Sequence, residues 1–253
     1  MTRYGYISHT SIGQYNARMD EMLRHDDQLE VEPTELLTPD RHWSVRDFDS
    51  TLIELTKTKS AIPGRDRPES IDLQGEPWRQ SMDGMWKYTK ETGFESGQIA
   101  LADVGTGAIV MGEFSTGDDA SVNLIKTRQQ GREAEQVPVV MMHCHPDEAM
   151  NRHGFTDVDF ISFLADTDIQ ATIVRYGDRN ALLAMKTSVT PDLSPEETTV
   201  RIRETRDEFL GPGSNPITAL PQFNKTVCVE FGLTLYHMSP ESKGVFKRIE
   251  VTS

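Results

Sequence analysis

The pattern of apolar and polar positions predicts two helices early in the chain. Apolar side chains recur close to the helical period in residues 11–24 and again in residues 44–57. The segment 62–75 is rich in Pro, Gly and charge, so we expect few contacts to cross it. We therefore predict an N-terminal helical extension, residues 1–72, and a main domain, residues 73–253.

The main domain is predicted to open with a helix and a β-meander. The helix begins at Pro77, which suits a first helical position, and ends at Gly93. Residues 98–104 and 108–114 then have the composition of strands, and the glycine-containing turn between them suits a tight hairpin.

Helix and strand patterns alternate in the middle of the chain. The apolar run 137–142 leads into His143 and is typical of a strand buried on both faces. A helix is expected to start near Thr156, and residues 171–176 and 181–187 form a further strand pair.

The C-terminal part adds a helix and a last hairpin. Ser194 opens a capping box with Pro at the next position, which predicts a charged helix to Leu210. After the loop 211–216, an apolar stretch leads to strands at 233–238 and 245–249. The whole pattern predicts an α/β fold, a mixed sheet flanked by helices.

Composition narrows the classes of partner. The chain has 253 residues, 40 of them acidic against 26 Lys plus Arg, and a formal net charge of -14. A phosphate polyanion would be repelled, so we expect no nucleic-acid partner. The start of the chain lacks an apolar signal core, and about 18 consecutive apolar residues occur nowhere. We expect a cytoplasmic protein without membrane contact.

The chemistry of the chain centres on two histidines. Cys144 and Cys228 are too few for a thiolate zinc site, so a metal must be held by histidine and carboxylate. Because alternate residues of a strand point to the same face, His143 and His145 can offer imidazole nitrogens to one ion while Cys144 faces the opposite layer. Pro146 then ends the strand.

A carboxylate from the next element would complete such a site. Asp159 lies in the first turn of the predicted helix and can supply a third ligand, leaving a fourth position for water. The Thr156 hydroxyl, one turn earlier, would face the oxygen that becomes anionic during attack on a carbonyl. Thr156 and Asp159 also fit a plain capping box, and the two roles are compatible.

A general base is expected upstream of the histidines. Glu95 stands just before the first strand of the meander and could take a proton from the attacking water and pass it to the leaving nitrogen. Three other glutamates also precede the histidines, namely Glu113, Glu133 and Glu135. Glu113 is the next alternative.

These residues resemble the motif of the JAB/MPN (JAMM) zinc metallopeptidases, in particular their prokaryotic deubiquitinase-like branch. The family has a Glu at a helix-to-strand junction, His-x-His-Pro after an apolar strand, and Ser/Thr-x-x-Asp at a helix start. In this chain the same order is read in residues 94–97, 143–146 and 156–159, and the resemblance covers roughly residues 77–190.

The resemblance implies a three-layer, cytidine-deaminase-like architecture and a specific set of roles. Zinc would be held by His143, His145 and Asp159, with Glu95 as general acid/base and Thr156 as oxyanion support. The substrate would be a protein or peptide amide or isopeptide bond, including a ubiquitin-like modifier conjugate. Two departures are the use of Thr for the commoner Ser and a longer spacer after Pro146, which admits a substitute ligand from His153, Asp157 or Asp147.

Other histidine-pair classes fit less well. An amidohydrolase barrel needs further histidines on later strands, and a cupin needs an all-β pattern, whereas this chain has several predicted helices. The alternative from another class is a non-catalytic MPN-like module that uses the fold as a docking surface.

Overall fold

The computed structural model describes residues 42–58, 67–118, 121–124, 129, 131, 136–146 and 153–250. The predicted helix at 11–24 lies outside these residues.

The described residues form five α-helices, four of which lie close to predicted helices, while the fifth, α7, was not predicted as a helix. They are α2 (Val45–Thr58), α3 (Trp78–Thr92), α5 (Asp157–Leu164), α6 (Pro195–Phe209) and α7 (Pro216–Glu230). The apolar stretch after the 211–216 loop is thus the helix α7, which Asn215 caps and whose interior contains Pro221. None of these helices is long and apolar enough to span a membrane.

The strands join one ten-stranded sheet. They are β1 (His42–Trp43), β2 (Ser70–Asp72), β3 (Ser96–Asp103), β4 (Ala108–Met111), β5 (Ser115–Thr116), β6 (Gln136–His145), β7 (Ala171–Tyr176), β8 (Asn180–Met185), β9 (Thr234–Met238) and β10 (Val245–Arg248). A short 3-10 turn, η4 (Pro240–Ser242), joins the last two.

The sheet is mixed, as the sequence pattern predicts. Its order is β1-β2-β10-β9-β8-β7-β6-β3-β4, with β5 paired to β3. The β6–β7 and β1–β2 pairs are parallel and the other pairs are antiparallel. The connection from β6 to β7 passes through α5, as a parallel pair requires a crossover.

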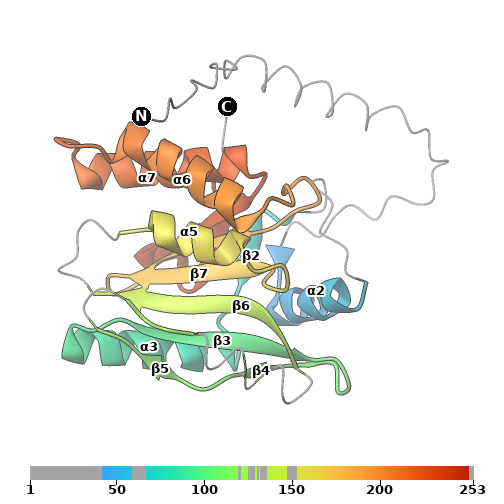
Figure 1. Ribbon diagram of the computed structural model, residues 1–253. Helices are drawn as coiled ribbons and strands as arrows, with labels where there is room; N and C mark the ends of the chain where they lie inside the picture. Colours follow the sequence, from blue (N-terminus) through green and yellow to red (C-terminus); the bar gives the residue numbers. More distant parts are fainter. Residues whose placement is uncertain are drawn as a thin grey trace. The chain divides into compact units, whose positions relative to one another are not determined.

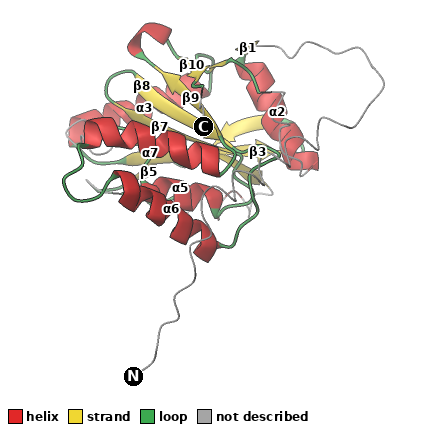
Figure 2. Ribbon diagram, turned by 90° about the horizontal axis from the view of Figure 1, so that it is seen from above, coloured by secondary structure: helices red, strands yellow, loops and turns green. Residues whose placement is uncertain are grey.

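Helices cover both faces of the sheet and enclose two apolar cores. On one face, residues of α2 and α3 pack against the strands around Phe48 and Trp78. On the other face, α5, α6 and α7 pack around Phe160 and Phe223. Figure 1 shows α5, α6 and α7 on one side of the central strands and α3 on the other, and Figure 2 shows the same helices from above. The fold is therefore α/β with three layers.

The predicted domain boundary near residue 72 needs correction. β2 pairs with β10, and β1 pairs with β2. Phe48 and Leu52 of α2 share one apolar cluster with Trp78 of α3. Residues 42–58 and 70–72 are therefore part of the same sheet and core as the C-terminal elements, and the Pro-rich segment between them does not divide two domains.

Candidate metal and active site

The two histidines lie side by side at the end of β6. They are 6% and 1% exposed, and the distance between the Nε2 atoms of His143 and His145 is 3.0 Å. Cys144 between them faces the opposite core, where burial raises the pKa of its thiol to about 12. Strand alternation therefore places both imidazoles on the α5 face and leaves the cysteine as a buried, unreactive side chain.

The first turn of α5 brings Asp159 to the same point. Thr156 is the N-cap residue, and its backbone N–H and hydroxyl donate to Asp159 Oδ2 at 2.7 and 2.8 Å. The other oxygen, Oδ1, lies 3.1 Å from Nε2 of His143. One carboxylate thus completes the capping box with Oδ2 and faces His143 with Oδ1.

The charge state of Asp159 is set by two opposing effects. Burial by itself raises the pKa of this carboxyl, whereas the charge of His143 and its hydrogen bond lower it, with His145 and the Thr156 N–H adding to the lowering. The net effect holds the pKa below its usual range. Asp159 is therefore ionised at neutral pH, which is the form that ligates a metal.

Glu95 enters the site from the neighbouring strand. It directly precedes Ser96, which pairs with Cys144, so it lies next to His145 across the β3–β6 ladder. Its side chain is buried, and Oε1 is 3.9 Å from Nε2 of His145. The backbone of Glu95 is held on its other side by hydrogen bonds with Asp118 and Gly117. Of the two candidate glutamates that the structure describes, Glu95 lines the cleft, whereas Glu113 is exposed and is not among the described wall residues.

These residues lie in a cleft of about 950 Å³ between α5 and the strands. Its described walls combine apolar side chains, among them Val122, Leu124 and Ile161, with the polar groups of the site. None of the described wall residues is Lys or Arg. The described lining is therefore a mixture of apolar, neutral polar, acidic and histidine side chains.

The donor set fits a metal ion. One ligand atom from each of His143, His145 and Asp159 lies within 4.8 Å of the others. The two Nε2 atoms are 3.0 Å apart, and carboxylate oxygens of Asp159 lie 3.1 and 3.6 Å from them. Ligand atoms on one tetrahedral ion with bonds of about 2.0–2.1 Å lie roughly 3.3 Å apart. The buried triad can therefore hold a metal ion.

The alternative ligands among the described residues have other contacts. Asp157 forms an ion pair with Arg206, with 3.0 Å between Oδ2 and a guanidinium nitrogen. The ring of His153 stacks on Tyr176 at a centroid distance of 5.5 Å. Neither belongs to the metal-binding triad. The third alternative ligand, Asp147, and the alternative base residues Glu133 and Glu135 lie outside the described residues.

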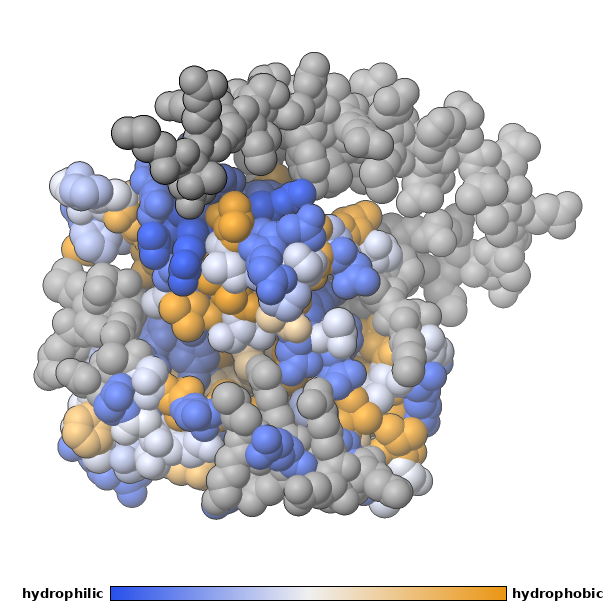
Figure 3. All heavy atoms as spheres, viewed as in Figure 1, coloured by the Kyte–Doolittle hydropathy of each residue, from blue (hydrophilic) through white to orange (hydrophobic). Residues whose placement is uncertain are grey.

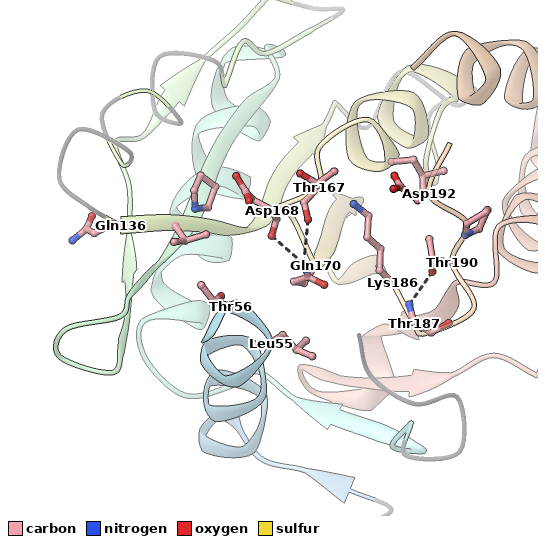
Figure 4. A pocket seen from close by; sticks show the side chains of 14 residues that line it. Leu55, Thr56, Gln136, Thr167, Asp168, Gln170, Lys186, Thr187, Thr190 and Asp192 are labelled. Carbon is pink, nitrogen blue, oxygen red and sulfur yellow. Dashed lines mark hydrogen bonds between the residues drawn. The ribbon is translucent and has the colours of Figure 1, made fainter. Parts of the chain in front are cut away.

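A second hollow, about 560 Å³, opens near the start of β6 beside α2 (Figure 4). Several of its polar groups already bond within the protein. The Gln170 amide donates to two backbone carbonyls, Thr190 accepts from the Thr187 N–H at 2.8 Å, and Lys186 donates to the Asp166 carbonyl at 2.5 Å. Titratable side chains therefore converge around the two histidines, and not in this second hollow.

Sequence reasoning did not single out the residues that support α5 from the C-terminal helices. Arg206 of α6 bonds to Asp157, and Asn224 of α7 bonds to both backbone polar groups of Phe155. These partners are separated by 49 and 69 positions along the chain. Only the fold shows that they meet.

A comparison with models of protein families and with curated protein sequences finds no match to this chain.

Proposed function

We propose that this protein is a zinc-dependent hydrolase of the JAB/MPN kind, which cleaves an amide or isopeptide bond of a protein or peptide, including a ubiquitin-like modifier conjugate. One observation carries the proposal: Glu95, which directly precedes β3, lines a single cleft together with the two histidines of β6 and Asp159 of α5. Their order in the chain resembles the motif of that family.

Zinc is proposed because of the donor set. Two neutral imidazoles and one carboxylate, with room for a fourth ligand, are typical of catalytic zinc, whereas Mg²⁺ and Ca²⁺ prefer oxygen ligands alone. A zinc ion at such a site acts as a Lewis acid on a carbonyl and lowers the pKa of the attacking water.

The protein's own groups then move the proton. The carboxylate of Glu95, buried beside His145, takes the proton of the attacking water and delivers it to the leaving nitrogen, which cannot depart as an anion. The cleft walls hold the chain on either side of the bond.

Thr156 has a structural role before any catalytic one. Its hydroxyl donates to Asp159 Oδ2 at 2.8 Å and so holds the carboxylate in place. Support of a developing oxyanion by this hydroxyl requires it to turn from Asp159 toward the substrate oxygen.

The test is a comparison of two glutamate variants on a fluorogenic substrate in which a peptide is joined to a lysine side chain. Glu95→Gln keeps the shape of the site but cannot accept a proton, and we expect kcat to fall by roughly 10²–10⁴-fold with zinc binding retained. Glu113→Gln, at an exposed position away from the cleft, is the matched control and should have wild-type activity.

Two results would contradict the proposal. One is a Glu95→Gln protein as active as wild type. The other is a zinc-loaded wild-type protein that cleaves neither peptide nor isopeptide bonds, while His143→Ala retains every binding partner. The second result would favour the non-catalytic docking module.

A further inference from the structure

The segment that leads into α5 is held by a buried side-chain amide of α7, which lies 69 positions later in the chain. Asn224 of α7 is 1% exposed. Its Oδ1 accepts from the Phe155 N–H at 2.9 Å, and its Nδ2 donates to the Phe155 carbonyl at 2.7 Å. The side chain therefore bonds both backbone polar groups of the residue that precedes the N-cap Thr156.

The chain around this contact is shaped to admit the amide. Gly154 has a φ of +150°, and a Cβ at this position would lie 2.8 Å from Asn224 Oδ1. Next to the amide, Phe223 packs against Phe160 of α5 with ring centroids 6.0 Å apart. The start of α5 is thus fixed against α7 by the hydrogen bonds of Asn224, by the ring contact of Phe223 and by the space that Gly154 leaves for the amide.

A second contact holds the first helical turn from α6. Asp157 is the first residue of α5, and its carboxylate bonds to Arg206 at 3.0 Å. The Arg206 side chain is 37% exposed and that of Asp157 is 18% exposed. This ion pair lies two residues before Asp159.

We infer that Asn224 and Arg206 are positioning residues for the metal site: they hold the first turn of α5 where Asp159 reaches the two histidines. His143 and His145 are placed by β6 itself, whereas Asp159 belongs to a short helix, α5, of eight residues. A short helix depends on tertiary contacts for its position. The position of Asp159 therefore depends on contacts outside its own helix, and α6 and α7 supply these contacts.

This inference rests on the metal-binding part of the proposed function and not on hydrolysis. The test is the zinc affinity of the full chain, measured by competition with a chromophoric chelator, together with the visible absorption of the Co²⁺-loaded protein. We expect Asn224→Ala to lower zinc affinity by roughly 10–100-fold, because supporting partners of metal ligands have effects of this size. The Co²⁺ absorption should change in band shape, because the carboxylate ligand is displaced.

The matched control is Thr205→Val. Thr205 of α6 is buried and donates to Glu230 of α7 at 2.9 Å, so the variant removes a hydrogen bond between α6 and α7 in which no residue of α5 takes part. It should lower stability and leave zinc affinity and the Co²⁺ spectrum unchanged. Equal losses of zinc affinity in Thr205→Val and Asn224→Ala would overturn the inference, since general loosening would then explain both.

Arg206→Ala covers the case in which Asn224→Ala does not fold. It removes a partly exposed side chain, so the core remains intact, and it should lower zinc affinity by a smaller factor than the buried amide does. If Asn224→Ala folds and binds zinc with wild-type affinity, the inference is overturned. If Asn224→Ala does not fold, wild-type zinc affinity in Arg206→Ala overturns it. A wild type that binds zinc but hydrolyses nothing would contradict the proposed function alone.

Discussion

Asp159 shows how one side chain can serve a helix and a metal site together. Its Oδ2 accepts the two hydrogen bonds of the capping box, while Oδ1 faces His143. The sequence motif Thr-x-x-Asp is compatible with both roles, and the structure shows the geometry for both at once. The common direction of the two histidines was predictable because alternate residues of a strand point to the same face, whereas Glu95 was one of four candidate glutamates ahead of the histidines. Asn224 was not predictable, because a buried asparagine has no local signal and its partner lies 69 positions away.

A second single residue, Asp49, predicts how the stability of the protein depends on pH. Burial raises the pKa of this carboxyl to about 6, although its hydrogen bond from Trp78 Nε1 lowers it. Because the pKa of Asp49 is higher in the folded protein than its ordinary value of 3.8, the protonated carboxyl favours the folded state. This contribution to the free energy of unfolding is complete below pH 3.8 and is lost as pH rises through about 6. Asp49→Asn keeps an acceptor for Trp78 and removes the charge. We expect the free energy of unfolding of this variant to exceed that of wild type by about 1 kcal/mol at neutral pH, and to equal it near pH 4. The figure allows for the partial exposure of the side chain.

Urea unfolding of chelator-treated protein across this pH range measures the difference. Asp47→Asn on the same helix is the control with the opposite sign, because hydrogen bonds from Ser44 lower the pKa of Asp47. It should lose stability at neutral pH. A gain for Asp49→Asn that is the same at pH 4 and pH 7 would contradict the assignment.

At the scale of elements, helices with strong end signals were predictable and the domain boundary was not. Ser194 and Thr156 cap α6 and α5 as the sequence indicates, and Gly93 ends α3 in the left-handed conformation. The Pro-rich segment 62–75 suggested a linker. It contains instead a three-residue strand, β2, that pairs with β10, and the partners in this pairing lie far apart in the chain. Local composition carries no information about such pairing.

The corrected boundary makes a prediction about α2. A fragment that begins at residue 73 lacks Phe48, Leu52 and Ile71, each 0% exposed in the full chain, and we expect it to show no cooperative thermal unfolding. In the full chain, Phe48→Ala should cost about 3–5 kcal/mol, whereas Glu54→Ala, at an exposed position of the same helix, should change stability by less than about 0.5 kcal/mol. A fragment that unfolds at the wild-type midpoint would restore the boundary near residue 72.

At the scale of the molecule, the sheet brings the site together and the surface helices fix it. The parallel β6–β7 pair sends the chain through α5 across the sheet end at which the histidines lie. In the view of Figure 3, the region of α6 and α7 is mainly hydrophilic on its outer side, while their inner sides pack on the core. The cleft therefore lies between the end of β6 and α5, and α6 and α7 contact the start of α5 from the other side.

The metal content of the purified full chain tests the central claim most directly. We expect one zinc per chain after expression in zinc-supplemented medium, and none in His143→Ala, which removes one of three ligands. His237→Ala, on β9 and outside the triad, is the control and should keep its zinc. A wild-type chain without stoichiometric zinc, or a His143→Ala chain that retains it, would contradict the account.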